Sequence, residues 1–163
     1  MKKLICLGLL IPPLVACSSP GKKEKENIAL VEGYIEAVEN LDYQAMYNFL
    51  AYGYVGRGTD YGDSVTKDAA LENWKYVSEF IYDEIDYRKS FNIAMSIPSG
   101  ENRGDWESNW AELHIRYLSG REVTLWANSV YRIEDGKIVR NLTFYNEMDA
   151  LRQLGFQVVS QDD

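Results

Sequence analysis

The apolar residues of this chain change their spacing at about Asp83. Before that point they recur every three or four residues, and after it they alternate with polar residues. The clearest helical stripe is Ala70, Trp74, Val77 and Ile81. The clearest alternation is Phe91, Ile93, Met95 and Ile97, and Pro98 follows it. Helices followed by an antiparallel series of strands predict an α+β domain whose helices cover one face of the sheet.

Three helices are predicted in the first half of the chain. Asn27 is the expected N-cap of the first, because an apolar stripe at helical spacing follows it. Asp42 and Thr66 are the expected N-caps of a short helix over residues 43–51 and of a third helix. Residues 52–63 between these two helices contain four glycines, so we expect a mobile loop there.

The second half predicts four strands and a last helix. Beyond the long strand before Pro98, strands are expected over residues 106–118, 121–133 and 138–146. Ser119 and Gly120 are the expected turn between the first two of these, and residues 134–136 connect the last two. A short helix over residues 147–155 ends at Gly155, a residue type favoured where helices stop.

The N-terminus has the pattern of a signal peptide. A basic pair at residues 2–3 precedes an apolar run over residues 4–15, which is too short to span a bilayer. The run ends in LVAC at residues 14–17, which resembles the lipobox of bacterial lipoproteins. This resemblance implies cleavage before Cys17 and acylation of that cysteine.

Three parts of the chain are therefore expected. They are a signal peptide over residues 1–16, the lipidated Cys17 with a flexible tether over 17–26, and one domain over 27–163. The protein is expected at the bacterial cell envelope, anchored in a membrane by its lipid. Ser18 after the cysteine favours the outer membrane by analogy with some bacteria.

Cleavage would also settle the cysteines and the charge. Cys17 would be the only cysteine left, so no disulfide is expected. Fifteen basic residues would face 25 acidic ones, a formal charge of −10, and such a surface repels nucleic acid. No cofactor or metal is predicted. A single histidine cannot build a zinc site, and DYGD at residues 60–63 has too few carboxylates for a calcium loop.

Three segments resemble the nuclear transport factor 2-like fold, and within it the SnoaL-like polyketide cyclases and ketosteroid isomerases. They are EGYIEAVENLD at residues 32–42, TKDAALENW at 66–74, and YRIEDGKIV with FYNEMDALRQLG between 131 and 155. The resemblance covers roughly residues 27–156. It implies a cone in which three N-terminal helices pack on a curved antiparallel sheet with a short C-terminal helix, and a pocket between helices and sheet.

The turn over residues 134–136 decides which strand residues face that pocket, and spacing alone leaves two alternatives. A two-residue Asp135-Gly136 turn pairs Ile133 with Ile138, whereas a three-residue turn with a bulge at Gly136 pairs Ile133 with Lys137. The two registers differ by one residue and so point opposite side chains inward. In the resembling families, positions matching Ser129, Thr143 and Tyr145 line the pocket, which favours the bulged register.

With the two-residue Ser119-Gly120 turn, this register predicts two faces. The pocket face, together with Tyr34 of the first helix, is expected to hold the ligand-binding residues Trp110, Glu112, His114, Ser129, Tyr131, Asn141, Thr143 and Tyr145. The other face is expected to hold Leu113, Ile115, Trp126, Leu142 and Phe144. That face is too apolar for solvent, and proteins of the resembling fold often dimerise sheet to sheet, so we expect a homodimer through it. Periodicity by itself favours the alternative that this face is the core and the polar set lies in solvent.

The resemblance also allows a comparison of catalytic residues. Tyr34 matches the oxyanion tyrosine of the isomerases, but Ser129 stands at the acid partner and Gly58 near the base. Thr143 stands where the cyclases have an acid/base aspartate, and a hydroxyl does not titrate near neutrality. His114, the only histidine, is the remaining candidate acid/base beside Glu112.

Three functions are consistent with this pattern. The one favoured is an envelope lipoprotein whose pocket binds a small hydrophobic or aromatic molecule. The alternative is an enzyme, a lyase, isomerase or hydrolase, in which His114 is the catalytic acid/base and Tyr34 the hydrogen-bond donor. A further alternative is a protein-interaction scaffold.

Overall fold

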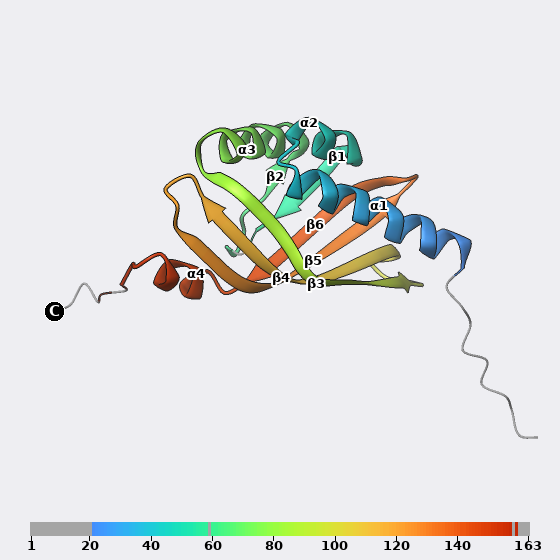
Figure 1. Cartoon of the computed structure of the whole chain (residues 1–163). Coiled ribbons are helices and arrows are strands. Elements are labelled where there is room, and N and C mark those ends of the chain that lie inside the picture. The colour runs from blue at the N-terminus through green and yellow to red at the C-terminus, as the bar shows by residue number, and fades with distance from the viewer. Residues whose placement is uncertain (1–20, 59, 158, 160–163) are drawn as a thin grey trace, which may run out of the picture.

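A computed structural model describes residues 21–58, 60–157 and 159 of the chain (Figure 1). The expected signal peptide over residues 1–16 and the expected lipidation site Cys17 lie outside the described residues. Among those residues, no helix combines the length and the apolar character that crossing a bilayer requires.

Three helices pack on one side of the sheet and a fourth lies near one end of it. They are α1 (Lys22–Glu39), α2 (Tyr43–Phe49), α3 (Lys67–Phe80) and α4 (Glu147–Gln153). The predicted caps of α2 and α3 are confirmed, because Asp42 accepts a hydrogen bond from the Ala45 amide and Thr66 from the Ala69 amide. The expected start of the first helix at Asn27 is wrong: α1 begins at Lys22, so residues 22–26, predicted as tether, are helical.

Six strands form one mixed sheet. They are β1 (Leu50–Arg57), β2 (Val65–Thr66), β3 (Tyr82–Ile97), β4 (Gly104–Tyr117), β5 (Glu122–Glu134) and β6 (Lys137–Tyr145). The strand order is β2-β1-β6-β5-β4-β3, in which β1 runs parallel to β6 and every other pair is antiparallel. The mobile loop predicted from residue 52 is wrong in its first half, which forms β1.

The turn between β5 and β6 has two residues, so the predicted bulge at Gly136 is wrong. Asp135 and Gly136 have φ of 49° and 68°, and Ile133 lies opposite Ile138. One residue further along β6, Val139 is the extra residue of a bulge, because the pairing moves from Ile133–Ile138 to Arg132–Arg140. The extra residue restores the expected side-chain direction, so Ser129 and Thr143 do face the helices.

The turn between β4 and β5 has three residues, one more than predicted. The Tyr117 amide donates to the Arg121 carbonyl at 2.8 Å, and Gly120 has a φ of 80°. Leu113 therefore lies opposite Leu125, and His114 opposite Thr124. The expected faces of β4 are exchanged: Leu113 and Ile115 are buried under the helices, whereas Trp110, Glu112 and His114 point away from them.

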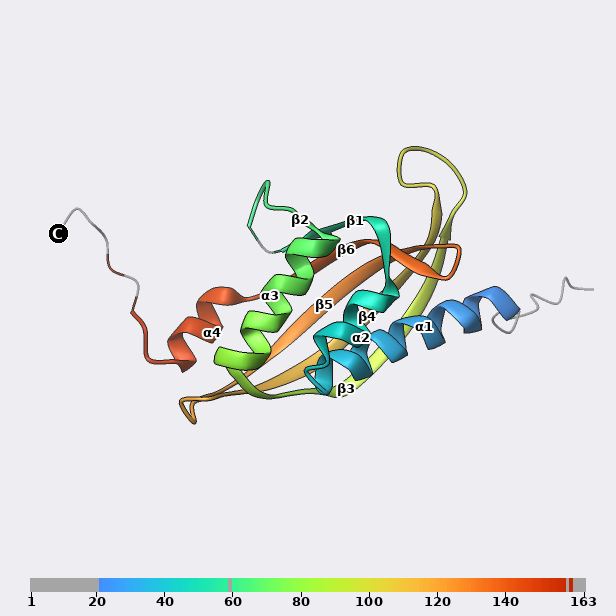
Figure 2. The same cartoon turned by 90° about the horizontal axis from the view of Figure 1, so that it is seen from above.

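The core lies between α1, α2 and α3 and the inner face of the sheet (Figure 2). The largest fully buried apolar side chains come from both layers: Val31, Val38, Met46, Val123, Tyr131 and Ile138. Each is at most 2% exposed, as expected for side chains that drive folding by leaving water. A cavity lined by residues of α1, α3, α4 and the sheet is the candidate site.

Candidate functional site

A cavity of about 500 Å³ lies between the helices and the inner face of the sheet. Helix α1 contributes Tyr34 and Val38, and helix α3 contributes Ala70 and Trp74. The opposite wall is the inner face of the strands, with Ile85, Leu113, Ile115, Val123 and Leu125 among its apolar residues. This volume lies within the usual range for small-molecule sites, and the walls are mostly apolar, as in such sites.

Tyrosines form much of the cavity wall. The Tyr34 ring contacts Tyr131 edge to face, with ring centroids 5.8 Å apart. Burial raises the pKa of Tyr34 to about 12. Burial likewise raises the pKa of Tyr54, Tyr87 and Tyr131 above the usual value for tyrosine. These phenols are therefore neutral hydrogen-bond donors at physiological pH.

Ser129, Asn141 and Thr143 form a hydrogen-bonded row on the sheet side of the cavity. Ser129 lies opposite Thr143 on neighbouring strands, and their hydroxyl oxygens are 3.0 Å apart. The Thr143 hydroxyl also donates to the Asn141 side-chain oxygen at 3.3 Å. The row adds polar groups to the wall without adding charge.

Charged groups lie only at the rim among the described residues that line the cavity. They are Arg57, Asp63 and Glu147, and all three side chains are exposed. The interior can therefore surround a neutral molecule and offer it hydrogen bonds, but it has no countercharge for an ion. Burying an unpaired ion would cost several kcal/mol, on the order of the whole binding energy of a weak ligand.

No family model matches the chain, and no curated protein matches it significantly. Solved structures do resemble it. A candidate polyketide cyclase from Xanthomonas campestris has a TM-score of 0.67 at 18% identity, over 80% of this chain and 98% of its own. An LEH-like epoxide hydrolase from Mycobacterium tuberculosis has a TM-score of 0.60 at 14% identity, over 81% of this chain and 91% of its own. The chain has the nuclear transport factor 2-like fold.

A third structure with this fold, a nuclear transport factor 2-like protein of unknown function from Burkholderia pseudomallei, has a TM-score of 0.59 at 21% identity. The match covers 80% of this chain and 98% of the other. The match to the three structures confirms the predicted fold, with one refinement: the sheet is mixed, because β1 is parallel to β6.

Six of the nine residues expected to bind ligand line the cavity of the nuclear transport factor 2-like domain. They are Tyr34, Ser129, Tyr131, Asn141, Thr143 and Tyr145. Their placement agrees with the expectation, and their role in ligand binding stays a prediction.

The expected position of Trp110, Glu112 and His114 in the pocket is wrong. All three lie on the outer face of β4, where Trp110 is 43% exposed and Glu112 pairs with Lys89 at 2.6 Å. The His114 Nδ1 lies 3.1 Å from the Thr124 hydroxyl, on that same outer face. The cause is the three-residue turn after Tyr117, which the Ser119-Gly120 pair did not reveal.

Sequence reasoning missed the tyrosines of β3 and β4 that line the cavity, namely Tyr82, Tyr87 and Tyr117. The spacing of Ile85 and Tyr87 contained a signal, since residues two apart on a strand share a face. The signal ends two residues later at Lys89, which has a φ of 49° and begins a bulge in β3. Beyond this bulge the apolar residues Phe91, Ile93 and Met95 belong to the outer face.

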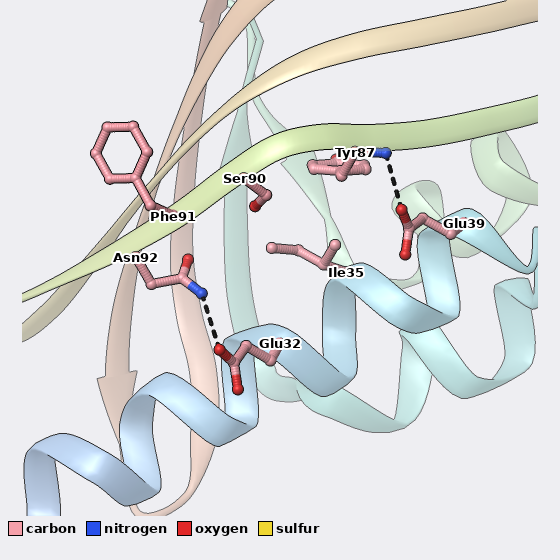
Figure 3. A pocket seen from close by; sticks show the side chains of 7 residues that line it. All are labelled: Glu32, Ile35, Glu39, Tyr87, Ser90, Phe91 and Asn92. Carbon is pink, nitrogen blue, oxygen red and sulfur yellow. Dashed lines mark hydrogen bonds between the residues drawn. The ribbon is translucent and has the colours of Figure 1, made fainter.

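A smaller groove of about 290 Å³ lies between α1 and β3 (Figure 3). Glu39 accepts a hydrogen bond from the Tyr87 amide at 2.8 Å, and the Asn92 amide donates to Glu32 at 3.5 Å. Phe91 points away from the helix in this view. The described residues contain no group of three or more metal-ligating side chains, so nothing in this groove indicates a metal site.

Proposed function

We propose that this protein is an envelope lipoprotein whose nuclear transport factor 2-like domain binds a small, uncharged, hydrophobic or aromatic molecule. The observation that carries the proposal is the cavity of about 500 Å³ with apolar walls and neutral hydrogen-bonding groups. Names of structures with the same fold, a candidate polyketide cyclase and an epoxide hydrolase, support a small organic molecule as the occupant.

The expected ligand is flat and carries at least one oxygen acceptor. Rings of Tyr34, Trp74 and Tyr131 offer surfaces for an apolar body. The phenols and the row of Ser129, Asn141 and Thr143 offer hydrogen bonds that a carbonyl or hydroxyl group would complete. An anion or a cation is disfavoured because the interior of the described cavity lacks a charge of either sign.

Binding without turnover fits the ionisable groups better than catalysis does. The titratable side chains inside the described cavity are tyrosines, and a phenol whose pKa is raised cannot act as a base near neutrality. The second candidate is an enzyme in which Tyr34 donates to a carbonyl or epoxide oxygen, and the names of the similar structures favour it. His114 has no part in that candidate, because it lies on the opposite face of the sheet.

Fluorescence of N-phenyl-1-naphthylamine, a neutral aromatic probe, tests the proposal. We expect saturable binding to the wild-type protein and loss of binding in Ala70→Phe, because Ala70 of α3 lines the cavity and a phenyl group would fill it. The matched control is Ala69→Phe, because Ala69 is the preceding residue of the same helix and its side chain is exposed. Equal binding by both variants would place the probe elsewhere and remove the support for this site.

Native mass spectrometry of gently purified protein distinguishes a binding module from an enzyme. If the protein retains a single neutral molecule and releases it chemically unchanged on denaturation, binding without turnover is supported. A mixture of two related molecules whose ratio changes with time would support the enzyme instead.

The envelope location is proposed from the sequence of residues 1–17. Helix α1 begins at Lys22, so four residues lie between Cys17 and the helix. Four extended residues span at most roughly 14 Å. A domain attached through acylated Cys17 would therefore remain close to the membrane surface, with the outer membrane as the favoured one.

We also propose that a second copy of the chain covers the outer face of the sheet. Aromatic side chains cross four adjacent strands there, namely Phe91, Trp110, Trp126 and Phe144, and Trp126 is 58% exposed. Arg132 and Arg140 lie opposite each other toward one end of this face, and Arg116 lies opposite Glu122 toward the other. A two-fold related copy can place the aromatic surface of one subunit against the same surface of its partner. Leu113 and Ile115, which were expected in this interface, belong to the core instead.

A further inference from the structure

A buried carboxyl group lies beneath the first helix. Glu107 of β4 is 0% exposed, and neither of its carboxyl oxygens has a hydrogen-bond partner among the described residues. Its lateral neighbours on the sheet are Ala94 of β3 and Tyr131 of β5, so it faces the helices and not the solvent. A carboxylate in such a place is costly unless it is protonated or paired.

The surroundings of Glu107 do not supply a positive charge. From α1, Glu32 adds a like charge. Lys23 of the same helix is paired with Asp105, with Nζ 2.5 Å from the carboxylate. On the inner face of β3 the nearest positions, Asn92, Ala94 and Ser96, do not ionise, and β5 presents the neutral phenol of Tyr131. Burial first, and the charge of Glu32 second, raise the pKa of Glu107 to about 7.

The polar contacts between helix α1 and the sheet are short at the two ends of the helix and longer between them, where apolar packing holds the helix. The Lys23–Asp105 pair holds the first turn, and Glu39 accepts from the Tyr87 amide at 2.8 Å in the last turn. In the middle, the polar contact with β3 is the long 3.5 Å hydrogen bond from Asn92 to Glu32 (Figure 3). The middle of α1 also carries Tyr34, whose ring contacts Tyr131, the neighbour of Glu107.

We propose that Glu107 is a proton-operated switch for the cavity, closed when its carboxyl group is protonated and loosened when it ionises. The effect of the switch on ligand binding rests on the proposed function, whereas the ionisation of Glu107 and its effect on stability do not. With the proton bound, the neutral carboxyl group is tolerated under α1 and Tyr34 remains against Tyr131. After ionisation the carboxylate needs water, which it gains when the middle of α1 moves away from β4. That movement opens the wall formed by Tyr34 and weakens ligand binding.

The direction of the pH dependence follows from the raised pKa. Near pH 4.5, the ordinary value for glutamate, an unfolded chain begins to lose this proton while the folded chain keeps it. Between that pH and about 7 the folded state therefore binds more protons, by about one per chain, and its stability falls as the pH rises. Above the folded pKa both states are ionised and the loss stops.

Urea unfolding of the domain at a series of pH values, with probe affinity measured in parallel, tests the switch. We expect the stability of the wild type to fall across this range with a slope of about one proton, and Glu107→Gln to lack that contribution. Glu32→Gln removes the like charge and should move the transition to lower pH. The matched control is Glu36→Gln, whose side chain is exposed on the same helix. This variant should leave the transition in place.

Affinity for N-phenyl-1-naphthylamine should fall between pH of about 6 and about 8.5 in the wild type and stay constant in Glu107→Gln. Equal pH profiles of the wild type and Glu107→Gln would overturn the switch, as would a transition that Glu32→Gln does not move. Failure of the probe to bind at any pH would overturn the proposed function. In that case a one-proton slope absent from Glu107→Gln would still assign the proton to Glu107.

Discussion

Ser129 of β5 lies opposite Thr143 of β6, and their hydroxyl oxygens are 3.0 Å apart in the wall of the cavity. The Thr143 hydroxyl also contacts Asn141, to whose side-chain oxygen it donates at 3.3 Å. The pair faces inward only because Val139 is an extra residue in β6. Without this bulge the two-residue turn at Asp135 would point Thr143 to the outer face and Phe144 into the cavity.

A double-mutant cycle of Ser129→Ala and Thr143→Val should reveal a coupling of about 1 kcal/mol in the free energy of urea unfolding. Each single variant removes the shared hydrogen bond and leaves the other hydroxyl with one partner fewer. A control cycle of Thr143→Val with Ser64→Ala, an exposed residue of the loop before β2, should be additive. Equal additivity in both cycles would mean that the hydroxyl pair contributes nothing to stability.

Alkaline titration should separate the cavity tyrosines from the rest. The pKa of Tyr34 is raised from about 10 to about 12, so the folded state keeps this proton longer than the unfolded state does. Stability should therefore be intact below pH 10 and fall as the pH rises through 12. We expect the stability of Tyr34→Phe to fall less steeply than that of the wild type, as measured by circular dichroism at increasing pH. The exposed Tyr52→Phe is the control, and an identical loss in both variants would contradict the burial of Tyr34.

His114→Gln should leave probe binding unchanged, because its imidazole lies on the outer face beside Thr124. The cavity-filling Ala70→Phe provides the positive control in the same fluorescence measurement. Should His114→Gln abolish binding while the protein remains folded, the three-residue turn between β4 and β5 would have to be wrong.

Local patterns predicted the four helices and strands β3 to β6 but not β1 and β2, whereas turn lengths limited the prediction of the site. The caps Asp42 and Thr66 and the alternation of β3 to β6 depend on residues near in sequence, so spacing found them. The faces of β4 depend on the length of the turn after Tyr117. Leu118 belongs to this turn together with Ser119 and Gly120, and the sequence does not show whether it ends the strand or begins the turn. This one extra turn residue places Leu113 on the inner face and His114 on the outer face. Three of the nine predicted ligand-binding residues therefore lie outside the cavity.

The glycine-rich strand β1 shows a second limit. Four glycines between residues 52 and 63 favour a loop, yet Gly53 and Gly56 lie within a strand. A Cβ at Gly56 would lie 2.5 Å from the Tyr54 hydroxyl oxygen, so this glycine allows the phenol to lie across the strand and reach the cavity. Close approach in three dimensions, and not local flexibility, explains the glycine, and spacing along the chain does not reveal it.

Cys17→Ser should move the protein from the membrane fraction to the soluble fraction of the bacterium that expresses it. Acylation of this cysteine is the expected attachment to the membrane. It is the one anchor that the sequence predicts, so its loss should release the protein. Detection by immunoblot after ultracentrifugation is sufficient, with Ser18→Ala as a control that should stay with the membrane. Retention of Cys17→Ser in the membrane fraction would contradict the lipobox.

Trp126→Asp should convert a dimer into a monomer on a sizing column. Trp126 is 58% exposed on the outer face, and Phe144, 53% exposed, lies on the neighbouring strand. In a two-fold interface each substitution acts twice, so two carboxylates would enter an apolar contact and lose hydration without gaining a partner. The control is Tyr52→Asp, because Tyr52 is 100% exposed and distant in the strand order from the β3 to β5 part of this face. Multi-angle light scattering of both variants gives the mass directly. If Trp126→Asp and the wild type share one mass, the outer face is not the contact between copies.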